Sequence, residues 1–199
     1  MAERNSGAFF LAFSKSRSPF LSSKMEHVLT TLSRLMEEHS LPALLIGGHA
    51  VTALGHPRAT FDIDLLIPRS AGPAWQEQLL RHQYRIFAEN RNFIQFESAS
   101  DFPLPALDLM LVDEDVFKTL HVSRTQNKPI PSPGAVAMVA LKLHAIHQPD
   151  REDPEKDWRD ILAIIDAQGL NLDDPDFSAT VLKHGGQDGI IRITNHLSI

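Results

Sequence analysis

Two aspartates one residue apart, Asp62 and Asp64, stand in a stretch where charged and apolar residues alternate. In a β-strand, residues i and i+2 point to the same face, so the alternation predicts a strand over residues 60–68 with both carboxylates on one face. The opposite face is predicted to be apolar and to consist of Phe61, Ile63, Leu65 and Ile67. Like charges this close are unfavourable unless a cation compensates them, and Mg²⁺ prefers oxygen ligands. The pair therefore predicts a Mg²⁺ site, with two solvated aspartates on an edge strand as the alternative.

A third carboxylate, Asp108, lies in a second predicted strand, over 106–112, between Leu107 and Leu109. Because the leucines occupy the opposite face, a strand beside the first would bring Asp108 to the same patch of carboxylates. Asp113 has the opposite parity and lies at the strand end, so Asp108 is the preferred ligand. Three carboxylates can hold two Mg²⁺ ions about 3.5–4 Å apart, which activates a hydroxyl and stabilises a leaving pyrophosphate. We therefore expect two Mg²⁺ ions, with Mn²⁺ as a substitute; an edge residue without a ligand role is the alternative.

A glycine pair, Gly47-Gly48, stands between a short apolar run over 43–46, predicted to be a buried strand, and a predicted short helix over 49–54. Glycines at such a junction let backbone N–H groups approach a phosphate, and the start of the helix adds a favourable dipole. The alternative is a simple tight turn. Arg58, just before the aspartate strand, could contact phosphate through its forked guanidinium, or could be an ordinary surface arginine.

These segments together resemble a known signature. Gly47-Gly48-His49-Ala50 and Arg58-x-Thr60-x-Asp62-Ile63-Asp64-Leu65 are similar to the motif of the DNA polymerase beta-like nucleotidyltransferase superfamily, in the form found in bacterial minimal nucleotidyltransferases and abortive-infection type IV toxins. The resemblance implies a mixed sheet flanked by helices, two Mg²⁺ ions, an NTP substrate and a third acidic residue on a later strand, which Asp108 matches. The serine often present in the glycine motif is absent, and Gly48-His49 stands in its place.

A second motif lies downstream. Lys142 and the segment Lys156-Asp157-x-x-Asp160 resemble a lysine-and-aspartate pattern of the toxin branch, and the resemblance assigns Lys142 and Asp157 to the nucleotide site. Lys142 would also interrupt the inward-facing apolar stripe of a helix predicted over 132–147, which is costly unless the lysine meets an anion such as a triphosphate or Asp157. The alternatives are a lysine that extends to the edge of the stripe, and solvated aspartates at 157 and 160.

The pattern as a whole predicts an α+β fold, in which a mixed β-sheet nucleotidyltransferase core flanked by helices is followed by a C-terminal helical segment. We expect an N-terminal arm over 1–21, the catalytic core over 22–131 and the helical segment over 132–199. Periodicity and turn residues predict the remaining elements, which are helices over 22–39, 73–82 and 155–168, strands over 84–88 and 93–97, and one or two short helices after residue 171. Ser132 and Pro133 are predicted to cap and begin the helix that carries Lys142.

Composition narrows the class of protein. The 199-residue chain has 43% hydrophobic residues, no cysteine and a net charge of −6. The absence of cysteine excludes disulfides and thiolate zinc sites and fits a cytoplasmic protein. No apolar run reaches the roughly 18 residues of a membrane helix, so no membrane partner is expected. The acidic balance lacks the general basic character of proteins that bind long nucleic acids.

We therefore expect an Mg²⁺-dependent nucleotidyltransferase that moves a nucleoside monophosphate from an NTP to an acceptor hydroxyl and releases pyrophosphate. The acceptor could be a tRNA end, a protein side chain or a small molecule such as an aminoglycoside. The alternative is a non-catalytic protein on the same scaffold that binds a nucleotide or a partner, as one half of a toxin–antitoxin pair with an antitoxin as its partner.

Overall fold

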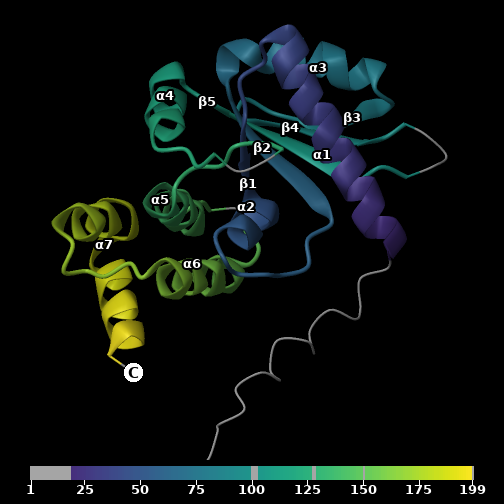
Figure 1. Ribbon diagram of the computed structural model, residues 1–199. Coiled ribbons are helices and arrows are strands. Elements are labelled where there is room, and N and C mark those ends of the chain that lie inside the picture. The colour runs from purple at the N-terminus through teal and green to yellow at the C-terminus, as the bar shows by residue number, and fades with distance from the viewer. Residues whose placement is uncertain (1–18, 100–102, 127–128, 150, 199) are drawn as a thin grey trace, which may run out of the picture.

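A computed structural model describes residues 19–99, 103–126, 129–149 and 151–198 of the chain. A five-stranded mixed sheet is at its centre, with the order β1-β2-β5-β4-β3 (Figure 1). The strands are β1 (Leu44–Ile46), β2 (Asp62–Pro68), β3 (Tyr84–Glu89), β4 (Phe93–Ser98) and β5 (Ala106–Val112). Strands β2 and β5 run parallel, and the pairs β1–β2, β3–β4 and β4–β5 are antiparallel. The predicted α+β fold with a mixed sheet is thus confirmed.

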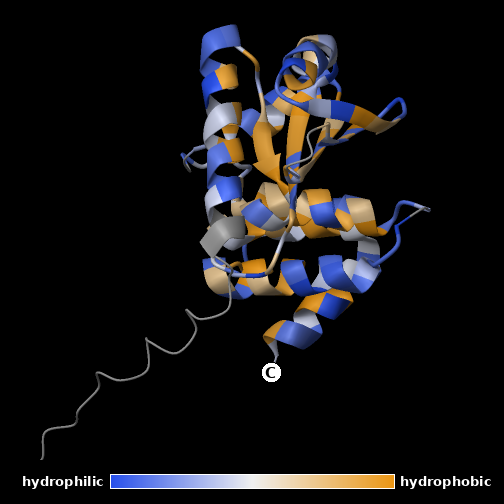
Figure 2. Cartoon of the chain, turned by 90° about the vertical axis from the view of Figure 1, so that its right-hand side faces the viewer, coloured by the Kyte–Doolittle hydropathy of each residue, from blue (hydrophilic) through white to orange (hydrophobic). Residues whose placement is uncertain are grey.

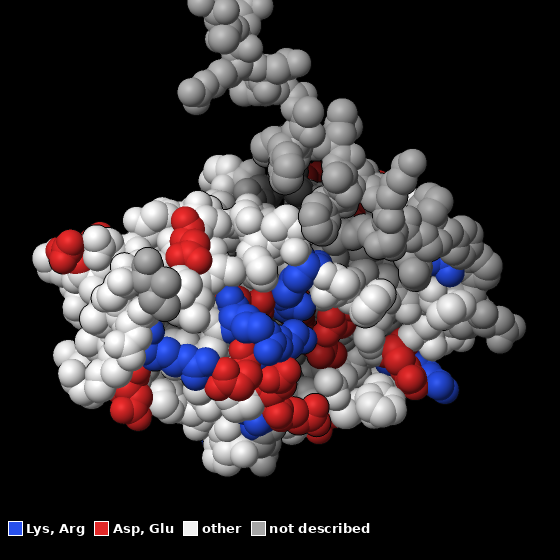
Figure 3. Space-filling view, turned by 90° about the horizontal axis from the view of Figure 1, so that it is seen from below, with Lys and Arg blue, Asp and Glu red and all other residues white. Residues whose placement is uncertain are grey.

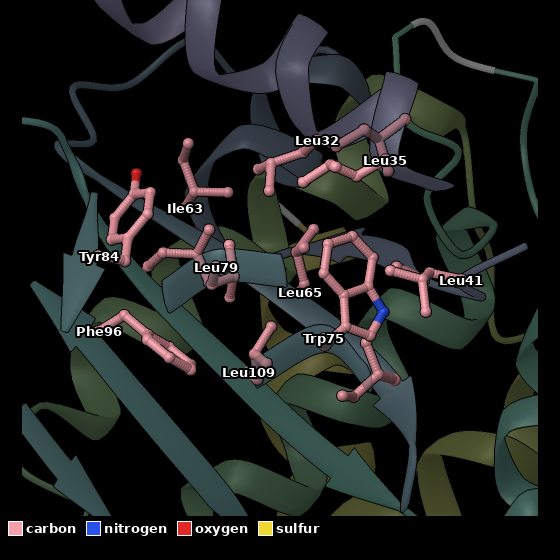
Figure 4. Close-up of a cluster of buried hydrophobic side chains, with 14 of the residues drawn as sticks. Leu32, Leu35, Leu41, Ile63, Leu65, Trp75, Leu79, Tyr84, Phe96 and Leu109 are labelled. Carbon is pink, nitrogen blue, oxygen red and sulfur yellow. The ribbon is translucent and has the colours of Figure 1, made fainter. Parts of the chain in front are cut away.

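One face of the sheet is covered by two helices, α1 (Pro19–His39) and α3 (Gly72–Arg81). Their apolar sides pack with the apolar faces of β2 and β5 into a first core (Figure 4). Ile63, Leu65 and Ile67 are fully buried there, as the alternation predicts. The indole of Trp75 lies in the same core, and its N–H donates a hydrogen bond to the carbonyl of Pro42 at 3.2 Å, which ties α3 to the chain just before β1.

The other face of the sheet contributes to a second core. Helix α2 (Gly47–Ala53) and helix α4 (Glu114–Val122) join it from the N-terminal part of the chain. Three further helices complete it, α5 (Ala135–Ile146), α6 (Pro154–Gln168) and α7 (Pro175–Leu197). Figure 2 shows hydrophobic residues lining both the sheet and the helices beneath it. Leu44, Ile46 and Leu66, from β1 and β2, belong to the same core as side chains of these C-terminal helices. Since Asp64 and Leu66 share a face of β2, the carboxylates lie on the side of the sheet that these helices flank.

The structure corrects three expectations about local structure. Phe61 lies before β2 rather than on its apolar face, and 71% of it is exposed. The helix bearing Lys142 begins at Ala135 with Gly134 as its N-cap, not at Ser132 and Pro133. The reason is that Ser132 is fully buried and its hydroxyl is hydrogen-bonded to Thr125 at 2.9 Å, so it does not cap a helix.

The third correction concerns a whole helix. Helix α4 follows β5 directly, where the sequence analysis expected no element. The region after residue 171 forms α7, in which two shorter helices meet at a kink at Gly186, whose φ is +62°, in agreement with the one or two short helices predicted there. Helix α6 ends at Gln168, as predicted, and Gly169 follows it in the left-handed conformation.

At the N-terminal end, α1 begins at Pro19, three or four residues before the predicted start at 22 or 23. The predicted arm over 1–21 lies, up to residue 18, outside the described residues. Among the helices of the described residues, none is long and apolar enough to cross a membrane.

Candidate active site

The register of the two parallel strands brings the predicted carboxylates together. Asp64 on β2 is the direct partner of Asp108 on β5, although 44 positions separate them in sequence. Asp62 lies on the same face of β2 as Asp64, two residues earlier, because side chains alternate along a strand. The hydroxyl of Thr60 donates to Asp62 Oδ1 at 2.8 Å, and Gln95 Nε2 donates to Asp108 Oδ2 at 3.4 Å. The three aspartates named by sequence therefore share one face of two neighbouring strands.

Mutual repulsion and burial change the acidity of this cluster. Burial, followed by the charges of Asp62 and Asp108, raises the pKa of Asp64 from 3.8 to about 6. Burial is also the main cause that raises the pKa of Asp108, with a further contribution from Asp62. Asp62 differs, because although burial pushes its pKa upward, hydrogen bonds from Thr60 and the backbone bring it below the usual value. The central carboxylate is thus the one whose negative charge is least compensated by the protein.

The glycine pair lies against this cluster. Gly47 has a φ of +62°, and a Cβ placed on it would come within 1.8 Å of Asp64 Oδ2. A Cβ on Gly48 would approach Thr60 Oγ1 to 2.6 Å. The pair thus allows the backbone of α2 to contact the Asp64 carboxylate and the Thr60 side chain that holds Asp62. The phosphate-binding role predicted for Gly47 and Gly48 remains a prediction.

A second group of charges is fully buried between α5 and α6. Lys142 Nζ lies 3.0 Å from Asp157 Oδ1 and 2.7 Å from Asp160 Oδ2. The side chain of Lys142 is 9% exposed, and those of Asp157 and Asp160 are 1% and 2% exposed. The alternatives of a lysine at the edge of its stripe and of solvated aspartates are therefore excluded. The anion that the buried lysine requires is supplied by these two carboxylates.

Two arginines extend this group at either end. Arg58 Nε lies 3.0 Å from Asp160 Oδ1, and Arg151 donates to Asp157 from Nε at 2.6 Å and from a terminal nitrogen at 2.9 Å. Burial alone would raise the pKa of Asp157, but the hydrogen bond from Arg151 and the charge of Lys142 hold it below its usual value. Residues Arg58, Asp160, Lys142, Asp157 and Arg151 form an alternating chain of charges, which we call the ion-pair chain. Arg58, predicted as a phosphate ligand, is engaged with Asp160 in this structure.

Sequence reasoning gave no role to two residues near the site. Asp160 was treated as a flank residue, yet it bridges Lys142 and Arg58. Lys156, in the first turn of α6, is exposed; its charge helps to lower the pKa of Asp62 and partly opposes the rise in the pKa of Asp64. Its position directly before Asp157 was the only available signal, because sequence spacing on α6 does not reveal which strand the helix faces.

We call the surface formed by Asp62, Asp64 and Asp108 the carboxylate face, and its donor atoms suit a divalent cation. Its carboxylates are hard oxygen ligands on adjacent strands, and Gly47 leaves room beside Asp64. Within the ranges of the chain that the structure describes, no three His, Asp or Glu side chains are already drawn into a closed ligand set. The three carboxylates are therefore neighbours, and their side chains would have to move closer together to bind one cation.

Comparison with known proteins adds to this geometry. No family model and no curated protein matches the chain. Among solved structures, the antibiotic-resistance factor ANT(2″)-Ia superposes with a TM-score of 0.59 at 15% identity, over 88% of this chain and 97% of that one. A nucleotidyltransferase-like protein from Paracoccidioides brasiliensis gives 0.51 at 16% identity, over 82% and 94% of the two chains. The lincosamide adenylyltransferase LnuA gives 0.51 at 18% identity, over 71% and 94%.

The chain has a nucleotidyltransferase fold. In this nucleotidyltransferase fold the three aspartates lie on the parallel strands β2 and β5, and the ion-pair chain joins the segment before β2 to helices α5 and α6. None of the three solved structures just compared is described as a toxin, so the toxin branch and its antitoxin partner stay predictions.

Proposed function

We propose that this protein is a divalent-cation-dependent nucleotidyltransferase whose active site is the carboxylate face of Asp62, Asp64 and Asp108. The observation that carries the proposal is the pairing of Asp64 with Asp108 in a parallel register, with Gly47 against the Asp64 carboxylate. A purely structural face would not be expected to collect three carboxylates where burial raises the pKa of one of them to about 6.

Mg²⁺ is the proposed cofactor, with Mn²⁺ as a substitute, and Asp62, Asp64 and Asp108 are its proposed ligands. When bound, such ions would neutralise the carboxylates and the phosphates of an NTP and lower the barrier to displacement at phosphorus. The residues of the chain would do the rest: the face of β2 would orient the α-phosphate, and Gly47 and Gly48 would let the backbone approach the phosphates.

In the proposed reaction, an acceptor hydroxyl oxygen forms a bond to the α-phosphorus of the NTP. The bond between that phosphorus and the bridging oxygen to the β-phosphate breaks, and pyrophosphate leaves. Asp108 would help to hold the cation beside the acceptor hydroxyl and would accept the hydroxyl proton. Lys142 and Asp157 support the site through the ion-pair chain that reaches Arg58, next to Gly48.

The acceptor is proposed by chemical class. One solved structure with this fold is described as ANT(2″)-Ia in complex with adenylyl-2″-tobramycin, and another as an adenylyltransferase with bound lincomycin. These descriptions support a hydroxyl of a small molecule as the first acceptor to test, followed by tRNA ends and protein hydroxyls.

The test is a calorimetric titration of each of the four NTPs, with and without Mg²⁺, on the wild type and on Asp64→Asn. We expect at least one NTP to bind only when Mg²⁺ is present, and we expect Asp64→Asn to lose that binding. Asp115→Asn is the matched control, because Asp115 is 98% exposed on α4 and lies outside the carboxylate face. The NTP that binds is then used as donor in the acceptor screen.

The result that would overturn the proposal is equally defined. If no NTP binds with Mg²⁺ in the wild type, or if Asp64→Asn binds and transfers as the wild type does, the carboxylate face is not the active site. A folded protein that binds an NTP tightly but transfers to none of the acceptor classes would instead support the binding protein on the same scaffold.

A further inference from the structure

A shallow seam runs between α6 and the segment that leads from α2 into β2. Gln168 Nε2, at the end of α6, donates to the carbonyl of Leu54 at 2.8 Å. Further along the helix, Asp160 meets Arg58 at 3.0 Å. At the start of the helix, Lys156 is within electrostatic range of Asp62. The segment and the helix therefore run side by side. A Cβ on Gly48 would meet both Arg58 and Thr60, and Thr60 donates to Asp62, so the seam lies next to the aspartates.

An open depression of about 580 Å³ lies along this seam. Ligand pockets in proteins commonly have volumes of about 300–1,000 Å³, so the depression has room for a group of several atoms. Five of its lining residues carry basic side chains, namely His56, Arg58, Lys156, Arg159 and His196. Seen from below, toward α6, Lys and Arg side chains gather near the middle of the surface with acidic side chains beside them (Figure 3).

The acidic side chains of the depression are already engaged. Asp160 is bound by Arg58 and Lys142, and Asp166 lies 2.7 Å from His196 Nε2. Lys156 is different, since no carboxylate of the described parts of the chain lies within ion-pair distance of its ammonium. Arg159 has one long contact, at 3.7 Å, with the exposed Asp153. The depression therefore offers two cations, at positions 156 and 159, to an incoming ligand.

The ion-pair chain shows which of two lysines is available to a ligand. Lys142 is the lysine that sequence resemblance assigns to the nucleotide, but it is buried and held by two carboxylates at 3.0 and 2.7 Å. Lys156 is exposed, and its positive charge acts on the pKa of both Asp62 and Asp64. Of the two lysines, Lys156 is the one that can reach a ligand without breaking buried ion pairs.

We propose that the depression along α6 is a phosphate-binding subsite beside the carboxylate face, in which Lys156 and Arg159 contact the phosphate groups. The role of the subsite in catalysis rests on the proposed function, whereas its ability to bind phosphate depends only on Lys156 and Arg159. The phosphates come either from the NTP itself, as its leaving pyrophosphate, or from a phosphate carried by the acceptor.

The primary experiment titrates inorganic pyrophosphate into the protein at low ionic strength without Mg²⁺, by calorimetry. Lys156→Gln and Arg159→Gln are both exposed substitutions and should leave the fold intact. Each should weaken pyrophosphate binding by about tenfold, because each removes one charge-assisted contact. Lys118→Gln is the control, since Lys118 is 72% exposed on α4, and it should bind as the wild type does.

Two further arms separate the sources of the phosphate. If the phosphates are those of the NTP, Lys156→Gln should weaken Mg²⁺-dependent NTP binding by about tenfold. If they belong to the acceptor, NTP binding should be unchanged, and Lys156→Gln should instead lose its preference for a short oligonucleotide with a terminal phosphate over the same oligonucleotide without it. Either result supports the subsite.

Unchanged pyrophosphate binding in both Lys156→Gln and Arg159→Gln would overturn the subsite. Asp64→Asn separates this failure from failure of the proposed function. It should keep or tighten pyrophosphate binding without Mg²⁺, because it removes a nearby negative charge, while it loses Mg²⁺-dependent NTP binding. If the wild type binds pyrophosphate without Mg²⁺ but binds no NTP when Mg²⁺ is present, the proposed enzymatic function is refuted and the phosphate-binding subsite is retained.

Discussion

The carboxylate face and the ion-pair chain are two charged regions that differ in how their charges are compensated. In the ion-pair chain each buried charge meets its opposite, and Asp157 has a lowered pKa as a result. On the carboxylate face Asp64 meets carboxylates on two sides, and its pKa rises to about 6. The first arrangement is balanced by charges of the protein itself, whereas the second would be balanced by the cation proposed to bind there. A compensated charge indicates structure, and an uncompensated one indicates a binding site.

The largest effect should follow from breaking the ion-pair chain. Lys142→Met preserves volume but leaves the buried carboxylates of Asp157 and Asp160 without their shared cation. We expect the free energy of unfolding to fall by about 3–5 kcal/mol in urea denaturation. Lys118→Met, at an exposed site, should change it by less than about 0.5 kcal/mol. Equal stability of the two variants would mean that the ion-pair chain contributes nothing to the fold.

On the carboxylate face, removing a charge should raise the free energy of unfolding instead of lowering it. The pKa of Asp64 is raised from 3.8 to about 6, so between these values the folded state binds more protons than the unfolded state. Its contribution to the free energy of unfolding therefore falls as pH rises from about 4 to about 6, and the penalty is fully present above that window. Asp64→Asn removes the penalty and should stabilise the protein at about pH 8 by about 2–3 kcal/mol, since one pKa unit corresponds to about 1.4 kcal/mol.

The same variant should gain almost nothing at about pH 3, where both states of the wild type are protonated at this position. Chemical denaturation of the two proteins at both pH values measures the difference, with Asp115→Asn as the control. A variant that is less stable than the wild type at neutral pH would show that Asp64 is compensated within the protein, and would remove the contrast between the two regions.

The smallest effect concerns the glycine that borders the carboxylate face. Gly47→Ala and Gly169→Ala both place alanine at a φ of +62°, but only the first meets another atom, Asp64 Oδ2 at 1.8 Å. Both should lose about 1 kcal/mol from backbone strain, and Gly47→Ala should lose about 1 kcal/mol more as the Asp64 side chain is displaced. Mg²⁺-dependent NTP binding should be lost only in Gly47→Ala. If both alanine variants bind alike, the close contact with Asp64 has no functional meaning.

The sequence was sufficient for the carboxylates because strand periodicity is strict. Asp64 and Asp108 each lie between buried apolar residues, Asp62 lies two residues before Asp64 on the same strand, and their faces follow from parity alone. The register that sets Asp64 beside Asp108 could not be read in the same way, since it depends on strand pairing over 44 positions. The family resemblance, rather than the alternation, suggested that the two strands are neighbours.

Helices were harder to interpret for physical reasons. Asp160 lies on the flank of the apolar stripe of α6, and only the approach of Arg58 from another segment makes it a buried bridge. Ser132-Pro133 has the composition of a helix start, but the serine hydroxyl is hydrogen-bonded to Thr125 instead. Helix α4 was overlooked although Asp113 stands at its N-cap position and Phe117 and Leu120 have helical spacing.

The second core has a consequence for how the chain could be divided. Leu44, Ile46 and Leu66, from the strands, share that core with side chains from α5, α6 and α7. Cutting the chain near residue 131 would therefore expose apolar surface on both pieces, and neither piece should fold well by itself. Expressed together, the two pieces should reassemble around their common interior. The protein is in this sense a natural candidate for fragment complementation, with recovery of cooperative unfolding as the sign of reassembly.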